Sequence, residues 1–171
     1  MLASTSLKQA EASLSAAGII SAAAEAELLM CHCLEISRGE LATQLVLDTN
    51  LEAPSGFFDL VELRCTRVPL QHITGKAPFR SIELSVGEGV FIPRPETEQV
   101  VQVAIDFLAL LPGEPRALDI GTGSGAIAIS IAKETNAKVT AIELSEAAAE
   151  FARANISALG ANVDLLEGDF M

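Results

Sequence analysis

The chain has 171 residues, 50% of them hydrophobic, which is enough to bury a real core in one ordinary domain or two small ones. Its 11 basic residues stand against 23 acidic ones, and the net charge of −12 argues against general binding to a phosphate backbone. The sequence has no apolar run long enough to span a bilayer, and it lacks the basic start and apolar core of a signal peptide. These features predict a soluble globular protein of the cytoplasm.

The first 74 residues have the texture of a small helical bundle. Ser4, Thr5 and Ser6 offer caps for a first helix that ends at Gly18. Ser21 then opens a stretch rich in strong helix formers, AAAEAELLMCHCLEI. The pattern predicts two helices at the start of the chain.

Two shorter helices are expected next, over 39–47 and over 55–67. Pro54 is expected in the first turn of the second of these, where proline is tolerated. No nucleophile–base pair and no ligand cluster occurs in this part of the sequence. We therefore expect residues 1–74 to serve packing or docking rather than chemistry.

The three cysteines, Cys31, Cys33 and Cys65, are an odd and sparse set without disulfide spacing, which is typical of a reducing compartment. The CHC motif at 31–33 could suggest a metal site. Neighbouring helix positions point in different directions, however, and no second ligand pair follows. We predict buried thiols on a helix and no metal site.

From Lys76 the pattern changes to that of strands. The segment FRSIELSV at 79–86 alternates apolar and polar residues, and GVFI at 89–92 follows a turn at Gly87–Gly89. We expect these two segments to form a β-hairpin that links two domains, over residues 75–92.

After residue 93, helical and strand patterns alternate to the end of the chain. Such alternation predicts a parallel sheet covered by helices, as in Rossmann-like α/β domains. The expected elements are 95–110, 116–121, 124–135, 138–143, 145–158 and 162–167, beginning with a helix and ending with a strand.

A glycine-rich turn follows the first of these strands. The strand ends at Ile120, glycines follow at 121, 123 and 125, and a helix opens at once. Glycines let the chain turn sharply and let a ligand approach the backbone without a Cβ in the way. The pattern predicts a cofactor-binding turn, although it also satisfies the dinucleotide fingerprint in its alanine-ended form.

Two carboxylates beside the turn bear on which cofactor it holds. Glu143 closes the second strand, where a carboxylate can accept hydrogen bonds from both ribose hydroxyls of either a nicotinamide or an adenosyl cofactor. Asp119 stands two residues before the first glycine, where its charge would repel a pyrophosphate. S-adenosylmethionine carries a sulfonium and an ammonium instead of phosphates, so the sign of Asp119 favours it.

A third indication follows the last expected strand. Asp169 can accept a hydrogen bond from the exocyclic amine of adenine, and Phe170 can pack on the ring. Taken alone, Asp169 would indicate only an ordinary polar turn after a strand. In register with Asp119, the glycines and Glu143, it favours an adenosyl site.

Three motifs carry a resemblance to a known family: PLQHITG at 69–75, GVFIPRPETE at 89–98 and LDIGTGSGAIAI at 118–129. In this order and approximate spacing they resemble the peptide-chain release-factor glutamine methyltransferases, the HemK/PrmC group. The resemblance implies an N-terminal helical bundle, a hairpin link and a Rossmann-like methyltransferase domain. It also implies transfer of a methyl group from S-adenosylmethionine to the glutamine side-chain amide in the Gly-Gly-Gln loop of class I release factors.

The resemblance also assigns roles to residues. It implies a helical substrate-docking bundle over 1–74 and a methyltransferase domain over 93–171. The implied cofactor-binding residues are Phe91, Pro93 and Thr97 beside the cofactor, Asp119, Gly121, Thr122, Gly123, Ser124 and Gly125 around its methionine half, Glu143 at the ribose, and Asp169 and Phe170 at the adenine.

One expected motif is absent. The family holds the reacting amide with an Asn-Pro-Pro-Tyr motif after the fourth strand, and this sequence stops at Met171, just past the third. No catalytic residue is therefore assigned, and we expect the 171 residues alone to bind cofactor weakly and to transfer little or no methyl. The first strand would keep an open edge, which a dimer could cover.

Three other functions remain open on the sequence alone. The glycine pattern fits a nicotinamide-dependent oxidoreductase, and the missing motif is shared with amino methyltransferases that act on adenine in nucleic acid. A non-catalytic docking module is the third. Five of the 11 basic residues lie within 64–94, a cluster that could be a solvated face, could pair locally as Arg80 with Glu83 and Arg94 with Glu96, or could meet the release factor.

Overall fold

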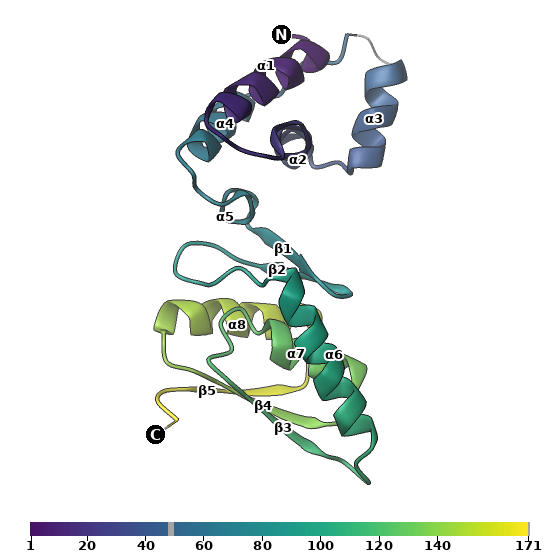
Figure 1. Ribbon diagram of the computed structural model, residues 1–171, viewed down its shortest axis with the longest axis vertical. Coiled ribbons are helices and arrows are strands. Elements are labelled where there is room, and N and C mark those ends of the chain that lie inside the picture. Colours follow the sequence, from purple (N-terminus) through teal and green to yellow (C-terminus); the bar gives the residue numbers. More distant parts are fainter. Residues whose placement is uncertain (48–49, 171) are drawn as a thin grey trace. The chain divides into compact units, whose positions relative to one another are not determined.

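The computed structural model describes residues 1–47 and 50–170, so Met171 lies outside the described residues. The chain forms two compact units, Met1–Thr74 and Gly75–Met171, each with its own hydrophobic core (Figure 1). Among the described residues, no helix is long and apolar enough to cross a membrane.

The first unit is helical, as the sequence predicts. Its helices are α1 (Ala3–Ala16), α2 (Ala22–Leu34), α3 (Arg38–Leu47), α4 (Phe57–Cys65) and α5 (Leu70–Thr74). The core lies between α1, α2 and α4, and its largest fully buried side chains include Leu14, Leu29, Met30 and Phe57. Apolar residues three and four apart on α1 and α2 bring these side chains to one side of each helix.

Two details of the bundle differ from the sequence prediction. Leu2, not a serine, occupies the N-cap of α1, because the backbone there pairs with a later segment: the Ala3 amide donates to the Leu51 carbonyl at 2.7 Å. Pro54 lies before α4 rather than in its first turn, and Gly56 is the N-cap. The short helix α5 was not predicted, and it contains His72.

The three cysteines are free thiols in helices. Cys31 is buried and Cys33 partly buried on α2, while Cys65 ends α4. Burial raises the pKa of both α2 thiols. The prediction of buried thiols on a helix is thus met most fully by Cys31.

The second unit begins with a hairpin of β1 (Lys76–Phe79) and β2 (Ile82–Ser85), joined by the two residues Arg80 and Ser81. The hairpin lies within residues 75–92, but its strands are not those predicted, because 79–86 is divided between strand and turn and GVFI is not a strand. Arg80 has a φ of 49°, a left-handed conformation that glycine or asparagine usually occupies in such turns.

The alternating pattern in the rest of the chain is confirmed to within about two residues per boundary, the usual uncertainty of element ends. The elements are α6 (Pro95–Ala109), β3 (Arg116–Ile120), α7 (Ala126–Glu134), β4 (Lys138–Glu143), α8 (Glu146–Leu159) and β5 (Val163–Glu167). The strands form a parallel sheet in the order β3-β4-β5. Parallel strands carry their helices as crossovers, which brings the carboxyl ends of all three strands to one edge.

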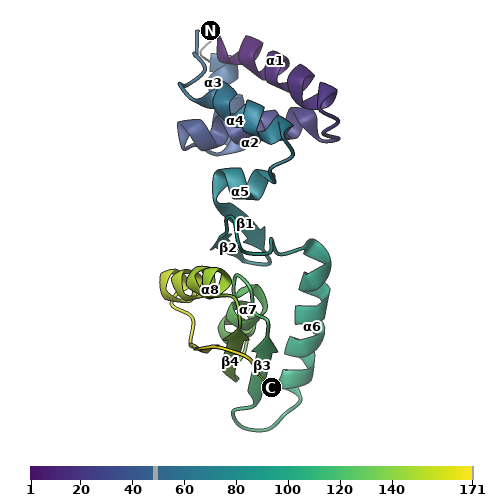
Figure 2. The same ribbon diagram turned by 90° about the vertical axis from the view of Figure 1, so that its left-hand side faces the viewer.

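Helices cover one face of this sheet. Figures 1 and 2 show α7 and α8 on the same side of the strands, and α7 packs against β3 and β4 while α8 packs against β4 and β5. On the other face, within the described part of the chain, the side chains of Leu118, Ile120 and Leu166 are exposed. The sheet therefore has one buried face and one apolar face open to solvent.

Candidate cofactor site

The glycine turn lies at the carboxyl end of β3 and leads directly into α7. Gly121, Gly123 and Gly125 all have positive φ, at 73°, 59° and 84°. A Cβ at Gly121 or Gly123 would meet nothing within 4 Å, so this backbone faces open space that a ligand can enter. A side chain at either position would strain the backbone and fill that space.

Two hydrogen bonds hold the turn against the neighbouring strand. The amides of Gly121 and Thr122 both donate to the carbonyl of Ile142 on β4, at 2.8 and 3.1 Å. The turn is therefore part of the sheet edge rather than a free loop. It presents its remaining backbone groups in a fixed arrangement beside the ends of β3 and β4.

Glu143 is the last residue of β4 and lies beside the turn. Its carboxylate accepts hydrogen bonds from the amide of Gly123 at 2.8 Å and from the amides of Leu144 and Ser145 at 2.9 Å each. The side chain is only partly buried, which leaves part of the carboxylate open to further donors. A charged acceptor thus stands at the mouth of the glycine turn with its orientation fixed by three backbone amides.

Asp119 lies on β3 just before the turn. Its Oδ2 accepts from the Thr122 hydroxyl at 2.7 Å and from the Ala128 amide at 3.2 Å. Burial raises the pKa of the Asp119 carboxyl, the bonds from Thr122 and Ala128 act in the opposite direction, and the charge of Glu143 raises it further. Two carboxylates thus flank one glycine turn, which makes the region favourable to a cation and unfavourable to an anion.

The end of β5 lies next to this pair of strands. The amide of Gly168 donates to the Glu143 carbonyl at 2.9 Å, so Asp169 and Phe170 follow directly after a residue bonded to the end of β4. The Phe170 ring is 60% exposed. An exposed aromatic ring at a strand end is available to pack against a flat ligand.

The segment before α6 is held by a different set of contacts. The Arg94 guanidinium lies over the Phe91 ring at 5.2 Å from its centroid, and the Thr97 amide donates to the Arg94 carbonyl at 3.0 Å. Pro95 occupies the first turn of α6, a position that proline tolerates. Phe91 is 66% exposed. Its contact with Arg94 and the bond from Thr97 to Arg94 both lie within this segment and do not reach the glycine turn.

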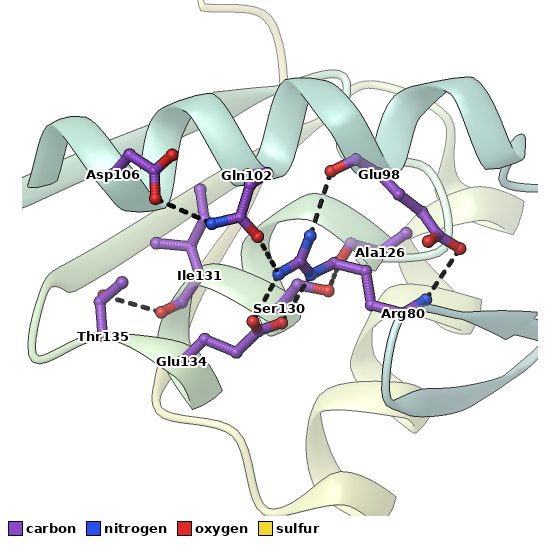
Figure 3. Close-up of polar contacts among 9 residues, drawn as sticks. All are labelled: Arg80, Glu98, Gln102, Asp106, Ala126, Ser130, Ile131, Glu134 and Thr135. Atoms are coloured by element: carbon purple, nitrogen blue, oxygen red, sulfur yellow. Dashed lines mark hydrogen bonds and ion pairs between the residues drawn. The ribbon is translucent and has the colours of Figure 1, made fainter.

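Arg80 ties the hairpin turn to two helices. Its guanidinium donates to both oxygens of Glu134 on α7 at 2.7 and 2.6 Å, and its Nη1 donates to the Glu98 carbonyl on α6 at 3.1 Å (Figure 3). The Arg80 amide also donates to the Glu98 carboxylate at 3.0 Å. This side chain fastens the first turn of α6 to the end of α7. The local pair of Arg80 with Glu83 that the sequence allows does not form, because Glu83 pairs with Lys76 instead.

The other arginines of the basic cluster are also occupied. Arg64 forms an ion pair with Glu25 at 2.6 Å with both side chains largely buried, and Arg67 donates to the Gly18 carbonyl at 3.3 Å. These contacts hold helices of the bundle together. Truncating Arg64 would therefore disturb the bundle, and a contact between the basic cluster and the release factor stays a prediction.

Comparison with known proteins gives the class of the second unit. Residues 117–171 match the family model described as a methyltransferase domain, and residues 5–75 match the PrmC N-terminal domain. Together with the parallel sheet and its glycine turn, these matches define a helical domain followed by part of a methyltransferase domain. Among solved structures, a Pyrococcus abyssi tRNA (uracil-54, C5)-methyltransferase shares 20% identity, with a TM-score of 0.45 over 55% of this chain and 23% of that one.

Curated relatives then show which proteins the whole chain is similar to. The chain is 47% identical over 163 residues to the release factor glutamine methyltransferase of Streptomyces coelicolor, and 43% identical over 166 residues to that of Mycolicibacterium smegmatis. These alignments cover 94% and 96% of this chain and 56% and 57% of the relatives. Over nearly its whole length the chain is similar to release factor glutamine methyltransferases, and it spans a little more than half the length of these relatives.

Proposed function

We propose that these residues form the docking and cofactor-binding part of an enzyme that uses S-adenosylmethionine to methylate the Gly-Gly-Gln glutamine of class I release factors. The observation that carries the proposal is the pair of carboxylates, Asp119 and Glu143, on either side of the glycine turn. They favour the positively charged end of S-adenosylmethionine and disfavour a pyrophosphate. A nicotinamide cofactor fits the same turn less well.

Each predicted site residue has a part in this proposal. Gly121 to Gly125 pass around the methionine half, and the backbone of Gly121 and Gly123 faces open space. Glu143 accepts from the ribose hydroxyls with the carboxylate capacity that its three backbone bonds leave free. Asp169 and Phe170 bind adenine at the end of β5.

Phe91, Pro93 and Thr97 form the wall beside the transferred methyl group. Two prolines and the Arg94–Phe91 contact stiffen this segment, and Arg80 fixes the helix that follows it. A stiff wall keeps an incoming side chain aligned without ordering a loop at each turnover. The proposal gives these residues a positioning role.

The cofactor supplies a methyl group on a sulfonium, and the acceptor is an amide nitrogen. That nitrogen is a poor nucleophile because its lone pair is delocalised into the carbonyl, so acceptors must hold its protons and orient it. The Asn-Pro-Pro-Tyr motif that does this in the family does not occur in these residues. We therefore propose that the 171 residues bind cofactor and that methyl transfer needs the additional length of the relatives.

Methylation of a purified class I release factor tests the proposal. The protein extended to the length of its relatives is incubated with S-adenosylmethionine and the release factor, and the Gly-Gly-Gln peptide is measured by mass spectrometry. We expect one added methyl on the glutamine, none when that glutamine is changed to alanine, and none with the 171-residue chain. Methyl transfer to adenine in DNA or RNA instead would contradict the proposed substrate.

A further inference from the structure

One face of α8 contacts both the segment after the hairpin and the glycine turn. A Cβ on Gly87 would lie 2.8 Å from the Phe151 ring, and one on Gly89 would lie 3.0 Å from the Cβ of Ala147. A Cβ on Gly125 would lie 3.7 Å from the Cα of Ala152. Helix positions four apart lie on the same face, so this side of α8 packs on two segments at once.

Asn155 lies one turn further along this face and makes the polar part of the contact. Its side chain is 2% exposed. Its Oδ1 accepts from the Ser85 amide at 2.7 Å, and its Nδ2 donates to the Ser85 carbonyl at 3.0 Å and to the Ser124 carbonyl at 2.9 Å. One amide side chain thus pairs with the end of β2 and with the middle of the glycine turn.

These bonds complete a two-sided grip on the turn. Glu143 holds the amide of Gly123, and Asn155 holds the carbonyl of the next residue, Ser124. Asn155 bonds only backbone atoms, two on the hairpin and one on the turn. Its side chain therefore fixes the position of the backbone in both segments. A buried amide in the middle of a helix is costly unless every such bond is made.

We propose that Asn155 is a positioning residue for the cofactor. It holds the glycine turn in its ligand-accepting shape and couples that shape to the end of the hairpin. The part of the inference that concerns the cofactor rests on the function proposed above. The part that concerns the turn does not, because it follows from the three hydrogen bonds.

Hydrogen exchange on the ligand-free 171-residue chain tests the coupling directly. In Asn155→Ala we expect the amides of Ser85 and Gly123 to exchange faster by about tenfold or more, because the Ser85 amide loses its acceptor and the turn that carries Gly123 loses its bond at Ser124. In Asn155→Asp the acceptor for the Ser85 amide remains while both donors are lost. We expect Ser85 to stay protected in that variant and Gly123 to become exposed to exchange.

The matched control is Val101→Ala, which opens a cavity at a fully buried position on α6, a helix that takes no part in these bonds. It is compared at equal loss of melting temperature, and we expect exchange at Ser85 and Gly123 to change by less than about twofold. Protection of Gly123 that is unchanged in both Asn155 variants would overturn the proposal. So would an equal loss of Gly123 protection in the control.

Titration with S-adenosylhomocysteine by calorimetry tests the link to the cofactor. We expect the dissociation constant to rise about tenfold in Asn155→Asp and to stay within about twofold in the control. An unchanged affinity with an exposed Gly123 would overturn the cofactor role of Asn155. If the wild-type chain binds no S-adenosylhomocysteine, the proposed function fails, and the exchange data still decide whether Asn155 holds the turn.

Discussion

At the scale of single residues, Asp119 decides between cofactor classes. It stands two residues before the first glycine of the turn, and it is held there by the Thr122 hydroxyl and the Ala128 amide. Its pKa is raised chiefly by burial, because burial disfavours the charged form of the carboxyl. Keeping that charge in the folded protein therefore costs free energy. A bound cation would offset that cost, whereas a bound phosphate would add to it.

The change Asp119→Asn tests this electrostatic role. S-adenosylmethionine has a sulfonium that S-adenosylhomocysteine lacks, so losing the charge should weaken the former by roughly three- to tenfold more than the latter. Calorimetric titration of both ligands gives the ratio. The control is Thr122→Val, which removes a hydrogen bond to Asp119 without changing any charge. An equal loss for both ligands in Asp119→Asn would show that Asp119 acts by structure alone.

At the scale of elements, the hairpin turn depends on contacts that are distant in sequence. Arg80 adopts a left-handed φ without the usual glycine, and its bonds to Glu98 and Glu134 span 18 and 54 residues. Those bonds compensate for the backbone conformation. The pair with Glu134 lowers the pKa of that carboxyl.

A pH dependence follows from the lowered pKa of Glu134. The folded pKa lies below the unfolded one, so the pair stabilises the fold at neutral pH and its contribution is lost as the pH falls below about 4.5 towards the folded pKa. Glu134→Gln should therefore lower the melting temperature by a few degrees at pH 7 and by less under acid conditions. Thermal melts measured from neutral to acid pH check this.

Glu83→Gln is the control, because Glu83 pairs with Lys76 in the same hairpin while both side chains stay about 60% exposed. Exposed pairs contribute little to stability, so this variant should match the wild type at every pH. A difference between Glu134→Gln and wild type that stays constant with pH would contradict the linkage to Arg80.

The elements also show what the sequence could and could not predict. The parallel sheet, the glycine turn and the residues around it follow from local periodicity and from glycine spacing, which act over a few residues. The hairpin strands were misplaced because the two-residue turn at Arg80 and Ser81 contains no glycine, asparagine or aspartate, the residues that usually mark such turns. Asn155 and Arg80 were missed as well, since their roles arise only when segments distant in sequence fold together.

At the scale of the whole molecule, the exposed apolar surface is large. The exposed side chains Val100, Val103 and Phe107 on α6, and Leu110 at its C-cap, recur at helical spacing. Leu118 and Ile120 are exposed on β3, which is an edge strand in the described sheet. Contiguous apolar surface and an open strand edge both favour association.

We expect the purified 171-residue chain to self-associate. Light scattering coupled to size exclusion should give a mass above 17.9 kDa that rises with concentration. Val103→Glu should lower the extent of association, while Ala154→Glu, which adds the same charge at an exposed position on α8, should not. A single species of monomer mass at all concentrations would contradict this expectation.

The most direct test of the central claim, that the glycine turn with Asp119 and Glu143 holds an adenosyl cofactor, is a paired titration of the 171-residue chain. S-adenosylhomocysteine and NADH are titrated separately into the same preparation and followed by calorimetry. We predict saturable binding of S-adenosylhomocysteine at one site and no measurable binding of NADH. Binding of NADH with no response to S-adenosylhomocysteine would contradict the claim.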